Sequence, residues 1–245
     1  MRAAVLLGGL LLPALLPRTA HAQPPSPELL EKLSHHAVVF EEIARRGSFT
    51  FDRLIEELDR SGKVDERKHM VARVDKDGKH STHMVVLRAE EDGHDTTQKE
   101  QDDARKENEK EAKDHPDGHN DDAFHMPFLA TEQARYVFDQ VATDPADPTR
   151  VQISFVPKKA AKNTIEGSAW VDTVSGTVIS TGVKLSQPPE HVDWVHVTAE
   201  FGAKTPLGPA ISHVTFEAKG GFLFIIRKHF HVDIHLTDYQ IAPQG

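Results

Sequence analysis

The densest group of metal-ligand side chains in the sequence lies between residues 115 and 125. It consists of His115, Asp117, His119, Asp121, Asp122 and His125. Imidazole and carboxylate groups bind Zn²⁺, but a structural zinc site needs four ligands that an ordered surrounding shell holds in place. A loop of Pro, Gly, Asn and Asp without an apolar anchor provides no such shell. We therefore expect no tight metal site and no cofactor, with His115, His119 and His125 as candidates for weak metal binding at most.

Catalytic motifs are absent from the sequence. It contains no Gly-x-Ser-x-Gly, no His-Glu-x-x-His, no phosphate-binding loop and no cysteine nucleophile. Asp172 and Asp193 lie near a predicted hairpin, where an aspartate usually accepts backbone hydrogen bonds. His231 and His235 share one face of a predicted strand, but the strand rise separates them by about 13 Å, too far to bind one ion. The sequence therefore indicates a protein that is not an enzyme.

The first 22 residues have the pattern of a cleaved secretory signal peptide. Arg2 gives the positive start, residues 3–16 form an apolar run, and Ala20-His21-Ala22 is a cleavage site of small residues. The apolar run is shorter than the about 20 residues that a membrane span needs. The chain has no cysteine, which excludes both a lipid anchor at the cleavage point and disulfides. We expect cleavage after Ala22, a periplasmic protein, and one domain over residues 23–245.

The charge pattern argues against a nucleic-acid partner. The formal net charge of the chain is −9, and residues 90–122 contain 14 acidic but only 5 basic side chains. A protein that binds nucleic acid carries a basic stripe, which this sequence lacks. After the signal peptide, no apolar run is long enough for a transmembrane segment.

Residues 26–46 are predicted to form a helix. Ser26 is a suitable N-cap, Pro27 fits the first turn, and apolar residues recur at helical spacing up to the stop at Gly47. His35 and His36 point about 100° apart on such a helix, and we expect both to be solvated. Residues 48–90 are predicted to be a meander of strands between turn sequences. The run from 51 to 60 also fits an amphipathic helix, but we favour a strand.

A charged insert at residues 94–122 interrupts the apolar pattern. Opposite charges recur at helical spacing, as in Asp102 with Lys106 and Arg105 with Glu109, which favours a solvated helix. Because this helix has no apolar stripe, we expect an exposed arm or a disordered segment that does not dock on a core.

The C-terminal half is predicted to contain about six antiparallel strands. Residues 150–157 alternate cleanly, a hairpin and a third strand follow within residues 165–201, and Gly220-Gly221 is expected to be a break. In the last strand, one face carries Phe230, Val232, Ile234 and Leu236. The predicted fold class is α+β, mainly antiparallel β, with an N-terminal helix and the charged helical insert.

Several of these features occur together, and in this order, in a known family. They are the signal peptide, the N-terminal helix, the turn from Glu57 to Val64, and the charged segment opening at Asp92-Gly93-His94-Asp95, followed by the Gly167–Asp172 hairpin strand and Thr237-Asp238-Tyr239. On these residues the chain resembles exported bacterial proteins of the outer-membrane lipoprotein-carrier-like (LolA/LolB-like) superfamily. The resemblance implies a bent antiparallel half-barrel whose open side is covered by helices. In the carriers, the apolar cavity between sheet and helices holds lipoprotein acyl chains.

The resemblance predicts an apolar cavity on the concave face of the sheet. Its candidate lining residues are Phe155, Trp170, Ile179, Val183, Trp194, Phe216 and Phe224. The expected partner is a lipid, an acyl chain or a lipidated protein. Two alternatives stay open: a structural module whose cavity is filled by its own side chains, and a metal-binding protein acting through residues 115–125. The two tryptophans fit either a packed core or a cavity wall.

Overall fold

The first regular element is a 20-residue helix, α1 (Pro27–Arg46), which begins and ends as the sequence predicts. The Ser26 hydroxyl accepts a hydrogen bond from the Leu29 backbone N–H at 3.2 Å, which satisfies one of the free donors of the first turn. Leu29, Leu33 and Ala37 form its buried stripe. His36 is buried as well, against the Phe201 ring, so the expectation that it is solvated is wrong.

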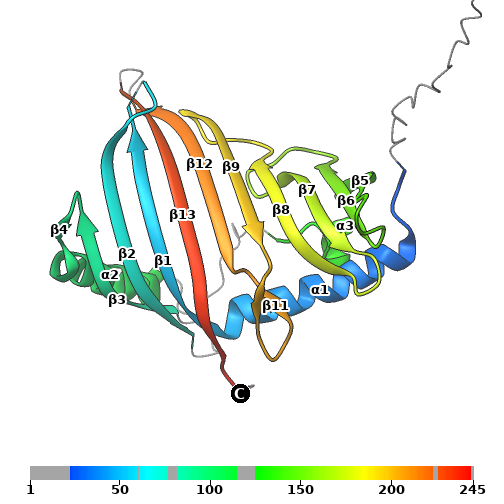
Figure 1. Cartoon of the computed structure of the whole chain (residues 1–245), viewed down its shortest axis with the longest axis horizontal. Coiled ribbons are helices and arrows are strands. Elements are labelled where there is room, and N and C mark those ends of the chain that lie inside the picture. The colour runs from blue at the N-terminus through cyan, green and yellow to red at the C-terminus, as the bar shows by residue number, and fades with distance from the viewer. Residues whose placement is uncertain (1–22, 60, 77–81, 115–124, 223–225, 244–245) are drawn as a thin grey trace, which may run out of the picture.

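The strands form one open sheet in this computed structural model, which describes residues 23–59, 61–76, 82–114, 125–222 and 226–243. The strands of the sheet are β1 (Gly47–Leu58), β2 (Val64–Lys76), β3 (Thr82–Glu91), β4 (His94–Asp95), β5 (Tyr136–Thr143), β6 (Arg150–Pro157), β7 (Ile165–Asp172), β8 (Thr177–Leu185), β9 (Val192–Glu200), β12 (His213–Phe222) and β13 (Ile226–Ile241). Their order is β4-β3-β2-β1-β13-β12-β9-β8-β7-β6-β5 (Figure 1). The edges β4 and β5 lie at opposite ends, so the sheet is not closed.

The other elements of the described residues are the helices α2 (Thr97–Asp114) and α3 (Ala130–Gln133) and the two-stranded pair of β10 (Ala203–Lys204) and β11 (Pro209–Ala210). The predicted fold class is confirmed, including the strand meander and the preference for a strand near residue 51. The expected break at Gly220-Gly221 is wrong, because β12 continues through both glycines to Phe222.

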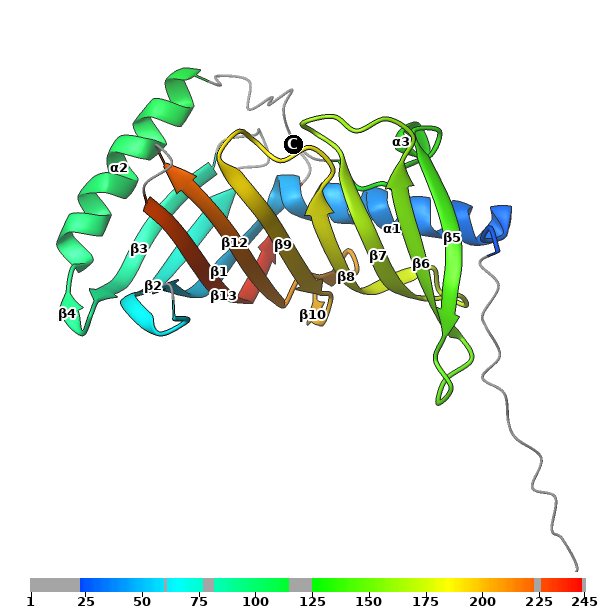
Figure 2. The ribbon, with the colours of Figure 1, turned by 90° about the horizontal axis from the view of Figure 1, so that it is seen from above.

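Both long helices lie on the same face of the sheet, which we call the inner face (Figure 2). On one side, Leu33 and Ala37 of α1 pack with Phe155 and other buried residues of β5 to β8. On the other side, Ala104 of α2 is buried with Met70 and further residues of β1 to β3. Direct cross-strand partners share a face, and one unbroken row of them joins the two regions: Phe155, Gly167, Val183, Val197, Phe216, Val232 and Ile55.

The insert helix α2 docks on the sheet, contrary to the expectation of an exposed arm. It binds mainly through polar side chains that reach the backbone of β3, a strand whose outer edge is paired with β4 over two residues. The Asn108 amide accepts a hydrogen bond from the Met84 N–H at 3.1 Å and donates one to the Met84 carbonyl at 3.0 Å. Gln101 donates to the Val86 carbonyl at 3.0 Å. A helix without an apolar stripe can therefore cover a strand edge by satisfying its backbone groups.

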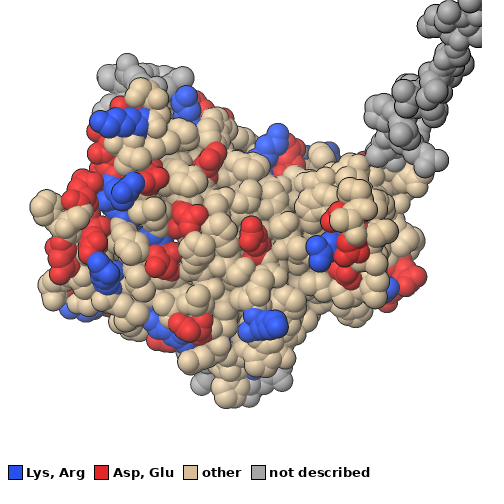
Figure 3. Space-filling view, viewed as in Figure 1, with Lys and Arg blue, Asp and Glu red and all other residues tan. Residues whose placement is uncertain are grey.

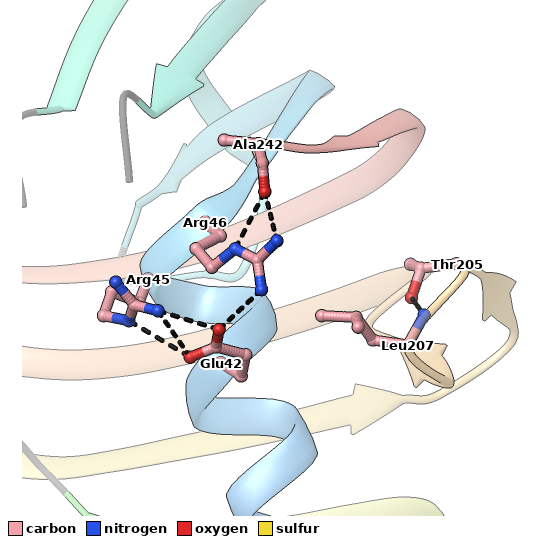
Figure 4. Close-up of polar contacts among 6 residues, drawn as sticks. All are labelled: Glu42, Arg45, Arg46, Thr205, Leu207 and Ala242. Carbon is pink, nitrogen blue, oxygen red and sulfur yellow. Dashed lines mark hydrogen bonds and ion pairs between the residues drawn. The ribbon is translucent and has the colours of Figure 1, made fainter. Parts of the chain in front are cut away.

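The end of α1 is tied to the end of the chain by a buried guanidinium (Figure 4). The Arg46 side chain donates hydrogen bonds to the Ala242 carbonyl, which follows β13, and pairs with Glu42 at 2.7 Å. Glu42 also pairs with Arg45 at 2.8 Å. Hydrogen bonds from Arg45 and Arg46 lower the pKa of Glu42 to about 2. The cluster joins α1 to β13, the neighbour of β1 in the sheet.

Replacing Leu33 by Ala should lower the free energy of unfolding by about 2–5 kcal/mol, because Leu33 is 0% exposed and the change leaves a cavity against the sheet. Val38→Ala is the matched control on the same helix. Its side chain is 56% exposed, so the effect should stay within about 0.5 kcal/mol. Urea unfolding followed by circular dichroism measures both. Equal effects of the two changes would contradict the packing of Leu33 against the sheet.

Glu42→Gln should reduce stability near neutral pH, and the difference from wild type should vanish in acid. The folded-state pKa of Glu42 is depressed, so its contribution is present above the unfolded-state value of about 4.3 and is lost as the pH falls through about 2. Denaturant unfolding at a series of pH values tests this expectation. Glu31→Gln, an exposed change on the same helix, serves as control. A difference that persists unchanged at the lowest pH would argue against the ion-pair cluster.

Asn108→Ala should increase hydrogen exchange at the Met84 amide, because that N–H loses its acceptor and faces solvent. Glu109→Ala, which changes the next residue of the helix, should leave this amide protected. Exchange resolved by NMR gives the comparison. If the Met84 amide exchanges equally in both variants, α2 does not protect the β3 edge.

Candidate functional site

An apolar groove opens on the inner face at one end of β9, β12 and β13. Its volume is about 600 Å³, within the range of roughly 300–1,000 Å³ typical of ligand pockets. The floor consists of Val195, Phe216, Ala218 and Phe230, which come from three adjacent strands. These side chains form a continuous apolar surface without an acid or a base among them.

The strand register explains how these four residues meet. Val195 pairs with Ala218, and Ala218 pairs with Phe230, so their side chains form one row across the inner face. Phe216 stands two residues away on β12 and belongs to the next row, with Val197 and Val232. Because side chains alternate along a strand, both rows point to the side that carries the helices.

The groove is the part of the inner face that neither helix covers. Phe155, in the same row as Phe216, is 1% exposed beneath α1, and Met70 is 7% exposed next to α2. The residues of the groove floor are all half-buried instead. Figure 1 shows α1 crossing the lower ends of the strands, and the residues of the groove belong to the upper ends of β9, β12 and β13.

The rim of the groove is charged. Lys228 forms an ion pair with Glu57 at 2.7 Å, and its ammonium group lies 5.9 Å from the centre of the Phe230 ring. The hydrogen bond to Glu57 raises the pKa of Lys228, so this side chain stays protonated. Glu190, His191 and Lys219 complete the polar border. An apolar floor with a charged rim suits a molecule that has an apolar chain and a polar end.

The two tryptophans lie on the opposite face of the sheet, which we call the outer face. Trp170 stands between the buried Ala169 and Val171 on β7, and Trp194 precedes Val195 on β9, so both point away from the groove. The expectation that they line the cavity is therefore corrected. Figure 3 shows this outer face, where acidic side chains are spread over the central strands.

The other predicted lining residues are divided between three places. Phe216 lies in the groove, Phe155 lies in the core under α1, and Val183 lies at the border of that core. Ile179 is half-buried at the irregularity where β8 pairs with β7, and Phe224 is outside the described residues. The prediction missed Val195, Ala218 and Phe230. The alternation of apolar and polar residues in the last strand could have identified Phe230.

The predicted metal candidates do not come together in the described part of the chain. His115 and His119 lie outside the described residues, and His125 is exposed, with its Nδ1 3.5 Å from Glu41 Oε1. His231 and His235 share the outer face of the sheet, opposite the groove. Asp172 accepts hydrogen bonds from the backbone N–H groups of Val174 and Ser175, which confirms the turn role inferred from the sequence. These hydrogen bonds also lower the pKa of Asp172.

The fold is an open antiparallel sheet with an apolar groove on its inner face. No protein-family model and no curated protein matches the chain. Among solved structures, it is similar to a LolA superfamily protein from Nitrosomonas europaea. The two are 8% identical with a TM-score of 0.39, and the match covers 89% of this chain and 93% of that one.

Two structures that contain MucB are also similar to the chain. MucB in complex with MucA(peri) is 10% identical with a TM-score of 0.23, over 87% of this chain and 98% of that one. The MucA/MucB complex of Pseudomonas aeruginosa is 11% identical with a TM-score of 0.22, over 88% and 99%. Scores this low carry no information about ligands or partners. No helix in the described residues is long and apolar enough to cross a membrane.

Proposed function

We propose that this protein is a non-enzymatic binding module that holds an apolar ligand, a lipid or a lipidated peptide, in the groove. The supporting observation is that Val195, Phe216, Ala218 and Phe230 stay half-buried on the inner face, whereas Phe155, in the same row as Phe216, is buried beneath α1. Apolar side chains gathered on an open concave surface gain free energy when a ligand covers them. The charged rim would hold the polar end of such a ligand in water.

The proposed site of action is the periplasm, after removal of residues 1–22. This part of the proposal rests on the apolar run and the small-residue cleavage site of the first 22 residues. An exported carrier of this kind would shield an acyl chain from water between two membranes. The alternative of a self-filled core fits the region under α1, where Phe155 and its neighbours are buried against the helix.

Affinity in the micromolar range is expected for a single acyl chain. Apolar burial contributes about 25 cal/mol per Å², and a few hundred Å² of contact would offset the cost of ordering the ligand. A tighter complex would need a second chain or polar contacts at the rim.

Brominated fatty acid should quench a tryptophan placed in the groove but not the natural ones. In a Phe216→Trp variant that also carries Trp170→Phe and Trp194→Phe, quenching should be saturable, because the bromine must touch the ring to act. In the wild type, both tryptophans lie on the outer face and their emission should be little affected. Saturable quenching of Trp194 in the wild type would place the ligand on the wrong face for this proposal.

Val195→Glu should weaken binding of a fluorescent acyl probe by about tenfold or more, since a carboxylate would have to be desolvated in the groove. The matched control is His196→Glu, which adds the same group at the next residue, exposed on the outer face. Thermal unfolding by circular dichroism shows that each variant is folded. A folded wild type without binding, or equal binding by both variants, would refute the groove as the ligand site.

A further inference from the structure

Three side chains that can bind a metal ion meet on the outer face of the sheet. They are His213 on β12 and Asp233 and His235 on β13. One donor atom from each lies within 4.8 Å of the other two. The Nε2 atom of His213 is 2.9 Å from one carboxylate oxygen of Asp233, and the Nε2 atom of His235 is 3.1 Å from the other. Two imidazoles thus converge on one carboxylate.

The strand pairing holds this cluster in place. His213 and His235 are direct partners in the antiparallel pair of β12 and β13, and their rings stack with centroids 4.4 Å apart and an angle of 5°. Asp233 precedes His235 by two residues and therefore points to the same face. Ligands on paired strands are held more rigidly than ligands on a loop. The cluster therefore differs from residues 115–125, where the sequence predicts no such frame.

The surroundings favour a cation and leave room for solvent. Glu200 Oε1 lies 4.0 Å from the Nδ1 atom of His213, where a carboxylate can orient a metal-binding imidazole. Asp52 on β1 is the direct partner of His235 on its other side. A hollow of about 470 Å³, lined in part by Asp52, Asp233 and His235, adjoins the cluster. The Asp233 and His213 side chains are 30% and 25% exposed, so the cluster is partly sheltered but open to ions.

We propose that His213, Asp233 and His235 form a binding site for a divalent transition-metal ion of the Zn²⁺ class. Zn²⁺ accepts two imidazole nitrogens and one carboxylate oxygen in a tetrahedral arrangement, with solvent or a further ligand in the fourth position. Mg²⁺ and Ca²⁺ prefer oxygen ligands, so the two histidines select against them. The ion would take the place of the shared hydrogen bonds to Asp233. This site lies on the face opposite the groove and does not depend on the proposed function.

Calorimetry with Zn²⁺ on the untagged full chain tests the site. His213→Gln and His235→Gln should each weaken binding by at least about tenfold, since loss even of an outer partner of a metal ligand costs that much. The matched control is His231→Gln, which removes an imidazole from the same strand and face, four residues away. It should bind as the wild type does. Each replaced side chain is partly or fully exposed, so the variants should fold, and circular dichroism checks this.

Co²⁺ gives a second readout. The wild type should produce the strong visible absorption of tetrahedral cobalt, and His235→Gln should lose it. The proposal is overturned if binding is unchanged in His213→Gln and His235→Gln, or if it is lost in a His115→Ala/His119→Ala variant instead. A cobalt spectrum that is identical with and without His235 would overturn it as well.

Discussion

The packing of α1 against the inner face of the sheet is the contact on which the rest of the architecture depends. A helix of 20 residues is about 30 Å long, whereas eleven strands at their usual spacing extend over roughly 50 Å. One helix therefore buries part of the face, and Leu33 and Ala37 seal the region of β6 to β8. The rest of the inner face needs another cover, which α2 supplies at the far end. The groove lies at the ends of β9, β12 and β13, where no residue of either helix lines it.

The two helices use different physical means to reach the sheet. The helix α1 buries an apolar stripe and is fixed at its end by the Arg46 guanidinium, whose charge is balanced by Glu42. The helix α2 buries Ala104 and otherwise relies on amides such as Asn108, which substitute for a missing strand. Polar docking of this kind does not require an apolar partner across the groove. This is why α2 can cover β3 while β12 and β13 stay open.

Local patterns in the sequence predicted the elements well but not which of them would be covered. The cap at Ser26 and the alternation of residues 150–157 depend on near neighbours, and both were found. Which strands a helix covers depends on tertiary packing, which the sequence pattern does not show. Phe155 and Phe216 were therefore equally good candidates for the groove. Trp170 and Trp194 were assigned to the wrong face because aromatic character does not determine on which face of a sheet a side chain lies. The pairing of His213 with His235 was missed because a break was expected at Gly220-Gly221, whereas β12 continues through both glycines and pairs with β13 along its whole length.

The groove and the histidine cluster lie on opposite faces of β12 and β13. The pairing register of these two strands therefore determines the position of both. On β12, Val214 and Phe216 point inward while His213 and Thr215 point outward. A slip of one residue would move the histidines into the groove and the apolar row into water. Close backbone contact helps to prevent such a slip: a Cβ atom on Gly220 would lie 2.7 Å from the His191 carbonyl oxygen, so this crossing of β12 and the start of β9 accepts glycine alone. Gly220, where a break was expected, therefore helps to hold the strands in the register that separates apolar from polar side chains.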